Sequence, residues 1–329
     1  MWRVHEPVLL KEVLHWLNPQ PGETIADLTV GNAGHFLEIL RRLDGRGLAI
    51  GVDADPEMLE VARRRIEAAG DLPPTPWMLI HSNFSAVDDI LRAAGVQALD
   101  GVLMDLGLNS MQLQADRGLS HQVDGPLDFR FDRTQGRPAA EWINSAPEEE
   151  LAQVFRDLGD ERRWARAMAR AIVRRRAERP IERTLELAAI LTRAIPPRWR
   201  TTRRPPAARA FLAIRAHINR ELPSLKTALE ELIPRLAPGG RLLVIAFNGN
   251  EDRVVKQAFR RVALSRRELR EREAGRGRTG GPAYRLIGTR PIYPSEEEIA
   301  ANPRARPARL RGLIREKDYD GEKDYEGKD

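Results

Sequence analysis

Short apolar runs alternate with helix-length segments along much of the chain. The segments between the runs, such as Pro56–Ala69 and Ser85–Ala94, have the length of helices. Because strands that alternate with helices form a parallel sheet covered by helices, the pattern predicts an α/β fold with a doubly wound, mostly parallel sheet. The expected strands are Thr24–Thr29, Leu48–Asp53, Trp77–His81, Gly101–Asp105 and Arg241–Phe247.

The connection between the fourth and fifth strands is too long for one crossover helix. About 135 residues separate Asp105 from Arg241, whereas a dozen or so residues suffice for a crossover. We therefore expect a helical domain to be inserted there. Its expected helices are Pro147–Leu158, Glu161–Arg176 and Thr184–Ala194, followed by an irregular basic loop over Ile195–Pro206 and by helices Ala207–Arg220 and Leu225–Leu236 that lead back to the sheet.

These observations give a domain prediction. The core comprises residues 1–110 and 208–317, and the inserted helical domain comprises residues 111–207. In the second part of the core, Leu236–Gly240 is predicted to form a tight turn that leads into the fifth strand. Residues 318–329 belong to a charged near-repeat with little apolar content, so we expect a disordered tail.

A glycine turn and an acid mark a cofactor site. Gly31 and Gly34 follow the first strand, and Asp53 ends the second strand. Glycines let a ligand approach the backbone, and an acid at a neighbouring strand end can accept both hydroxyls of a ribose. An adenosine-like cofactor is therefore expected. The spacing is not the dinucleotide fingerprint, and an ordinary tight turn is the alternative interpretation of the glycines.

Polar residues also follow the fourth strand. Asp105, Asn109 and Gln112 come where the carboxyl ends of strands line the ligand crevice of such sheets. An acid and amides there can hold an exocyclic amine. The alternative is that Asp105 caps the next helix while Asn109 and Gln112 satisfy a turn. The following run, 116–132, mixes acids, aromatics and turn residues as functional loops do, although a short edge strand is also compatible.

Composition narrows the class of protein. The 329 residues include no cysteine, which excludes disulfides and thiolate metal sites and suits a reducing compartment. No run of about 18 apolar residues and no signal peptide is present. The six histidines lack metal-ligand spacing, and no P-loop occurs. We expect a cytoplasmic protein without a metal site and without a membrane partner.

The charge is unevenly distributed. Residues 1–150 carry 13 basic and 24 acidic side chains, whereas residues 151–220 carry 18 arginines, no lysine and 6 acids. A block this basic suggests a surface that binds a polyanion such as RNA. The alternative is an arginine-rich composition of solvated helix faces, since arginine supplies 48 of the 54 basic residues throughout.

Several motifs are shared with a known family. They are His5–Leu10, Asp105–Gly107, Arg117–Ser120, Asp124–Asp132, Glu251–Arg253 and Asn302–Arg306. On these motifs the chain resembles the bacterial 16S ribosomal RNA cytosine-N4 methyltransferases, the RsmH or MraW family, from His5 to about Lys317. The resemblance implies a class I Rossmann-like fold that uses S-adenosylmethionine and carries a helical insert between strands four and five.

The resemblance implies roles for individual residues. Asp105 and Asn109 would hold the target amine, and an aromatic such as Phe129 or Trp199 would stack on the unstacked target base. The implied cofactor contacts are Ala33, Gly34, His35, Asp53, Phe84, Asp105 and Gln112. The implied RNA contacts are Arg198, Arg200, Arg203, Arg204, Arg209 and Arg215. The partner would be ribosomal RNA or the small ribosomal subunit, and the prediction leaves room for a homodimer.

The chain departs from the family's pattern near the expected active site. Asn248-Gly-Asn250 replaces His-Ser-Leu, Ala33 replaces a glycine, and Asn109 replaces a serine. Two alternatives therefore accompany the methyltransferase interpretation. One is a catalytically weakened paralogue that acts as an RNA-binding or ribosome-assembly factor. The other is a methyltransferase with a different RNA target.

Overall fold

The computed structural model describes residues 7–114, 117–200, 205–273 and 281–317. They form two compact units. The sheet unit contains the described residues of 6–53, 62–106 and 226–329, and the helical unit contains those of 54–61 and 107–225. The boundary passes through helix α3 (Pro56–Glu67). The predicted core and insert boundaries at 110 and 208 remain predictions, and the predicted tail lies outside the described residues.

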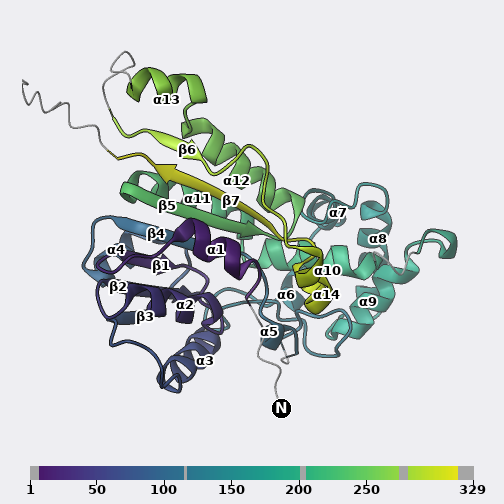
Figure 1. The fold of residues 1–329 in the computed structure, drawn as a ribbon. Helices are drawn as coiled ribbons and strands as arrows, with labels where there is room; N and C mark the ends of the chain where they lie inside the picture. Colours follow the sequence, from purple (N-terminus) through teal and green to yellow (C-terminus); the bar gives the residue numbers. More distant parts are fainter. Residues whose placement is uncertain (1–6, 115–116, 201–204, 274–280, 318–329) are drawn as a thin grey trace, which may run out of the picture. The chain divides into compact units, whose positions relative to one another are not determined.

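The sheet unit is built on seven strands in the order β3-β2-β1-β4-β5-β7-β6, drawn as arrows in Figure 1. The pairs among β1 to β5 are parallel, and β7 pairs antiparallel with β5 and β6. The predicted mostly parallel α/β sheet is therefore confirmed, and the two antiparallel strands at one edge are additional. The strands are β1 (Thr24–Asp27), β2 (Leu48–Asp53), β3 (Trp77–His81), β4 (Leu99–Asp105), β5 (Leu236–Ala246), β6 (Tyr284–Leu286) and β7 (Arg309–Arg315).

The strand order contains a switch point between β1 and β4. From β1 the chain moves outward to β2 and β3, and it then returns to the other side of β1 for β4 and β5. Because crossovers between parallel strands are right-handed, the two directions of travel put their helices on opposite faces, which leaves a crevice at the carboxyl ends of β1 and β4. The other helices of this unit are α1 (Leu10–Leu17), α2 (Gly34–Leu43), α4 (Val87–Ala94), α12 (Gly249–Val262), α13 (Arg266–Glu273) and α14 (Glu296–Ala301).

Strand β5 begins earlier than the sequence predicts. Leu236 already pairs with Leu99, and after a shift in register Arg241 pairs with Gly101. Gly239 has a φ of 83°, a left-handed conformation that favours glycine. The stretch that the sequence assigns to a tight turn is therefore an irregular first part of the strand, because the glycine absorbs the bend while pairing continues on either side.

The helical unit packs its helices around one apolar core. Helices α7, α8, α9 and α10 contact one another in pairs, and Phe155, Ile172 and Ile214 are fully buried in the core. The predicted helices are present, but α8 starts at Ala165 instead of Glu161, and the last helix spans Glu221–Leu232 instead of Leu225–Leu236. The helices are α5 (Ser110–Gln114), α6 (Ala139–Ser145), α7 (Glu148–Asp157), α8 (Ala165–Arg176), α9 (Thr184–Arg193), α10 (Pro206–Ile218) and α11 (Glu221–Leu232), which crosses the unit boundary; a short 3₁₀ turn, η1 (Pro197–Trp199), lies in the basic loop.

The run after α5 forms a compact irregular loop. Phe129 has a φ of 65° and is fully buried, and it packs on Phe211 with ring centroids 5.1 Å apart. The Asn219 side chain holds this conformation, donating to the Phe129 carbonyl at 2.8 Å and accepting from the Phe131 N–H at 2.8 Å. Within the described residues 117–132, the only ladder contact is an isolated bridge from Pro126 to Arg183. The edge-strand alternative is therefore wrong.

Candidate active site

Three neighbouring strands of the sheet unit each end on a carboxylate. Asp27 ends β1, Asp53 ends β2 and Asp105 ends β4, and these strands lie side by side on the two sides of the switch point. Parallel strands bring their carboxyl ends to one edge, so the fold gathers these side chains from distant parts of the sequence. This edge is where open α/β sheets bind ligands.

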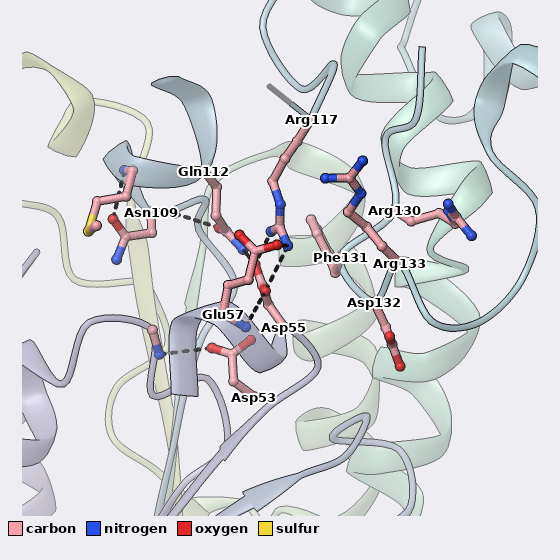
Figure 2. Close-up of polar contacts among 12 residues, drawn as sticks. Asp53, Asp55, Glu57, Asn109, Gln112, Arg117, Arg130, Phe131, Asp132 and Arg133 are labelled. Carbon is pink, nitrogen blue, oxygen red and sulfur yellow. Dashed lines mark hydrogen bonds and ion pairs between the residues drawn. The ribbon is translucent and has the colours of Figure 1, made fainter. Parts of the chain in front are cut away.

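The predicted glycine turn and acid are in contact. The backbone N–H of Gly31 donates to Asp53 Oδ2 at 2.9 Å, as drawn in Figure 2. Gly31 adopts a φ of 50°, which turns its N–H toward the neighbouring strand end. A carboxylate has about four acceptor positions, so Asp53 is suited to accept ribose hydroxyls in addition to Gly31.

A threonine joins the other two carboxylates. Thr29 donates its N–H to Asp27 Oδ1 at 3.1 Å, and its hydroxyl oxygen accepts the backbone N–H of Asp105 at 2.6 Å. The Thr29 hydroxyl also lies 3.4 Å from Asp27 Oδ1. Asp27 thus orients Thr29, which in turn fixes the end of β4 from which the Asp105 side chain projects.

Asp27 has a strongly perturbed pKa. Burial is the main cause that raises the pKa of this carboxyl to about 7; the nearby Asp105 and Asp53 carboxylates act in the same direction, and hydrogen bonds from Thr29 oppose them. The charged form is disfavoured because it lacks water and faces like charges. A perturbed acid at a ligand-binding edge is typical of functional sites.

The predicted Ala33-Gly34-His35 turn starts helix α2. Ala33 caps the helix with a φ of 63°, and a Cβ added to Gly34 would lie 2.7 Å from Pro7 Cγ. His35 is buried, and its Nε2 lies 3.0 Å from the Val8 carbonyl. Since a carbonyl only accepts, Nε2 carries the proton. Its Nδ1 faces Asp105 Oδ2 at 3.8 Å, and burial lowers the His35 pKa to about 4, so the ring is neutral near pH 7.

Phe84 lies in the turn after β3 and is half-buried. It stands at the carboxyl edge of the sheet, as the predicted adenine contact requires, but no described contact tests that role. The cofactor roles of Phe84, Ala33 and Gly34 therefore remain predictions.

In the helical unit, a buried arginine organises the residues that follow Asp53 in the chain. The Arg117 side chain is 2% exposed and Asp55 is fully buried. Arg117 binds both carboxylate oxygens of Asp55, one of them at 2.9 Å, and lies 3.3 Å from Glu57. Gln112 donates to Asp55 Oδ2 at 2.8 Å. Figure 2 shows the Arg117 side chain, Gln112 and the two acids converging.

The electrostatics of this cluster favour the charged pair. Burial opposes the charge of Arg117, but its hydrogen bonds with Asp55 hold its pKa above the ordinary arginine value. The sequence predicted Gln112 as a cofactor contact, whereas its amide nitrogen is engaged by Asp55 in the described structure. Its cofactor role remains a prediction.

Asn109 starts the short helix α5. Its Oδ1 accepts the Met111 N–H at 2.9 Å, and its own N–H donates to Gln112 Oε1 at 3.0 Å. This is the turn-satisfying role that the sequence left open as an alternative. Its Nδ2 group is a hydrogen-bond donor, so a role toward a target base remains a prediction.

The six predicted RNA-binding arginines have different environments. Arg209 donates to Glu161 at 3.1 Å, and the mostly buried Arg215 makes two contacts with Glu221. A phosphate would have to displace those carboxylates. Arg198 is exposed, and Arg200 donates to the Ile195 carbonyl at 2.8 Å. Arg203 and Arg204 lie outside the described residues.

The two aromatic residues expected to stack on a base differ in exposure. Phe129 is fully buried in the helical core, so the prediction that it stacks on a base is wrong in this structure. The sequence placed it in a loop, and it could not show that this loop packs into the core. Trp199 is 44% exposed and remains a candidate.

The departure at Asn248 has a local structural role. The Asn248 side chain accepts the N–H groups of Asn250 and Glu251, and Glu251 accepts the N–H of Phe247 at 2.7 Å. This capping box starts helix α12. Asparagine is among the best N-cap residues, so the replacement is explained by helix capping and is not by itself a sign of lost activity.

Three residues of the site went unassigned from the sequence. Asp27 was visible as an acid ending a strand, the same signal that selected Asp53. Arg117 begins one of the family motifs, but its pairing with Asp55 across about 60 residues is a tertiary contact that the sequence does not indicate. Among the described residues, no cluster of three or more metal-ligating side chains is present, and none of the described helices has the length and hydropathy to cross a membrane.

Comparisons with known proteins agree with this geometry. The MraW methylase family model matches residues 3–316. The chain is 43% identical over 312 residues to the ribosomal RNA small subunit methyltransferase H of Geobacter sulfurreducens, covering 93% of this chain and 97% of that protein. It is 42% identical over 315 residues to the same enzyme of Syntrophotalea carbinolica, covering 94% and 98%. The chain belongs to the MraW methylase family, which confirms the resemblance seen in its sequence.

Proposed function

We propose that this chain transfers a methyl group from S-adenosylmethionine to the N4 amine of a cytidine in small-subunit ribosomal RNA. The observation that carries the proposal is the family match over residues 3–316. It is supported by the carboxylates of Asp27, Asp53 and Asp105 at the ends of neighbouring strands. Relatives of matching length are named ribosomal RNA small subunit methyltransferase H, and no observation favours the assembly-factor alternative or a different RNA target.

The residues at the sheet edge fit the cofactor. Asp53 would accept the ribose hydroxyls, with Gly31 holding the carboxylate in place, and the turn at Ala33–His35 would surround the amino-acid part. The neutral His35 ring adds no positive charge beside a cationic sulfonium. Bound S-adenosylmethionine supplies an electrophilic methyl group, so no covalent enzyme intermediate is needed.

The nucleophile is the difficult partner, because the N4 lone pair of cytosine is delocalised into the ring. Asp105 would accept a hydrogen bond from the amine and hold the lone pair in line for attack. Its backbone is fixed by Thr29, and its side chain is 22% exposed, so it is rigidly placed yet accessible.

The test is methyl transfer from tritiated S-adenosylmethionine to small-subunit particles that lack the modification. The RNA is digested to nucleosides and the label is identified by mass spectrometry. We expect N4-methylcytidine. Label in another nucleoside would overturn the proposed target, and transfer to no RNA would overturn the proposed activity.

The proposal includes a cytoplasmic location, which the absence of cysteine in the chain supports. It also includes ribosomal RNA as the partner. A homodimer is a prediction that light scattering of the purified protein at several concentrations would check.

A further inference from the structure

Helix α8 presents a row of arginines on its outer surface. Its twelve residues include five arginines and no acid, and its inner face is buried through Met168, Ala169 and Ile172. Arg166, Arg170 and Arg174 are exposed. They are four residues apart, so they share one face at a spacing of about 6 Å along the axis.

Most other arginines of the helical unit have internal partners. Arg175, on the same helix, contacts Glu186 at 2.5 Å, and Arg176 donates to the Ile143 carbonyl at 2.7 Å. Arg170 pairs with Glu148 at 3.5 Å and with no other residue in the described part of the chain. Arg166 and Arg174 make no ion pair with any described residue. The exposed row therefore contributes little to the internal stability of the unit, whereas Arg209 and Arg215 are held by carboxylates.

An exposed aromatic platform stands at the start of the row. Trp199 is 44% exposed, and the Arg163 guanidinium lies 3.8 Å from its ring centroid. Arg163 lies in the turn just before α8, three residues ahead of Arg166 in the chain. An arginine stacked on an exposed indole offers flat surfaces on which an unpaired base stacks. Arg198, also exposed, adds positive charge beside it.

We propose that this surface binds a single-stranded segment of the ribosomal RNA substrate. It is called the α8 arginine face and comprises Arg163, Arg166, Arg170, Arg174, Arg198 and Trp199; helix α8 is labelled in Figure 1. The arginines contact phosphates, and Trp199 stacks on a base. The inference rests on the proposed function for the identity of the RNA. It assigns binding to α8 residues that the sequence did not single out.

The test separates charge from stacking. Binding of full-length 16S ribosomal RNA is measured as a function of salt for the intact protein, for Arg166→Gln/Arg170→Gln/Arg174→Gln, and for Trp199→Ala. Each lost phosphate contact should reduce the slope of log Kobs against log salt by roughly 0.7–0.9. The triple variant should therefore lose about two units of slope. Trp199→Ala should weaken binding roughly tenfold with little change in slope.

A matched control removes the same charge elsewhere. In helix α13, Arg266, Arg267 and Arg270 are also exposed, but its sequence RRELRERE interleaves arginines with glutamates. The triple Gln variant there should keep the intact slope. Circular dichroism and calorimetry with S-adenosylmethionine should give the intact protein's spectrum and affinity for all variants.

The outcomes distinguish this inference from the proposed function. An unchanged slope in the α8 variant, or an equal loss in the α13 control, overturns the α8 arginine face even if methyl transfer is found. Loss of slope confined to α8 supports it even if the intact protein methylates no RNA, because binding is measured without turnover.

Discussion

The two units of the molecule use charge in opposite ways. The sheet unit gathers carboxylates, with Asp27, Asp53 and Asp105 ending three neighbouring strands. The helical unit gathers arginines, some locked in ion pairs as Arg117 is with Asp55 and others exposed along α8. Acids suit hydroxyls, an amine and a cationic methyl donor, whereas arginines suit phosphates. The two proposals above follow this contrast, with the cofactor assigned to the sheet unit and the α8 arginine face to the helical unit.

The comparison also shows that residue type alone does not tell a structural charge from a functional one. Arg117 and Arg166 lie about 50 residues apart in the chain, and both belong to the helical unit. Arg117 is buried with two acids, while Arg166 is exposed and without an ion pair to any described residue. The first is expected to act on folding, and the second on binding.

The largest expected effect comes from breaking the buried pair. Arg117→Ala leaves the buried Asp55 carboxylate without the positive charge that balances it, which should lower the free energy of unfolding by about 3–5 kcal/mol. Urea unfolding followed by circular dichroism measures it. Removing the exposed pair partner in Arg92→Ala, whose ion pair with Asp89 is mostly solvated, should cost less than about 1 kcal/mol. If the two variants lost equal amounts of unfolding free energy, the prediction that the buried pair matters more than the exposed pair would be wrong.

If Arg117→Ala does not fold, a double variant keeps the prediction testable. Arg117→Met combined with Asp55→Leu removes both charges, so no uncompensated charge remains. It should be more stable than either single variant. A double variant less stable than both would show that the pair is net stabilising beyond charge compensation.

The next effect concerns catalysis at the sheet edge. Asp105→Asn keeps the size of the side chain but removes its charge and part of its acceptor capacity. Methyl transfer should slow by roughly 10²-fold, or about 2.7 kcal/mol in the activation barrier. Single-turnover transfer measures the rate, and thermal melting controls for folding. Equal rates for the two proteins would remove Asp105 from the site.

A pH effect should follow from the buried Asp27. Its folded pKa of about 7 exceeds the unfolded value, so its stabilising contribution is fully present below about pH 4 and is lost as pH rises through 7. Asp27→Asn should therefore stabilise the protein relative to the intact chain by about 2 kcal/mol more at pH 8 than at pH 5. Unfolding at both pH values checks it.

The quantity that tests Asp27 is the difference in unfolding free energy between the Asp27→Asn variant and the intact chain at each pH. Burial lowers the pKa of His35 to about 4, so its stabilising contribution is lost as pH falls below the pKa of an unfolded histidine. This change runs against the effect of Asp27 and is the same in both proteins. The difference cancels that contribution. A pH-independent difference would contradict the titration of Asp27 in this window.

The smallest effect tests the ribose contact. Asp53→Ala removes the acceptor that Gly31 orients, and charge-assisted hydrogen bonds of this kind contribute roughly 1.5–3 kcal/mol. The affinity for S-adenosylmethionine should fall at least about tenfold in calorimetry, with the salt slope for RNA unchanged. An equal loss of RNA affinity in Asp53→Ala would contradict the proposal that the cofactor and the RNA are bound by different units.

The sequence was enough to predict the parallel sheet, the positions of β1 to β5, the inserted helices, and a glycine turn and Asp53 at the same edge of the sheet. Each rests on local information: apolar periodicity, glycine punctuation and the rule that parallel strands end at one edge. The family motifs added the methyltransferase interpretation. The predicted and observed bounds differ most at the start of β5, where Gly239 bends the strand and the strand begins at Leu236 instead of Arg241.

Only the tertiary structure decided the rest. It buried Phe129 in the helical core, paired Arg117 with Asp55, and separated the arginines held by carboxylates from those exposed on α8. It also raised the pKa of Asp27, because desolvation and neighbouring carboxylates depend on the packed sheet. Burial, partners and electrostatic environment are set by residues distant in the chain, so no local pattern contains them.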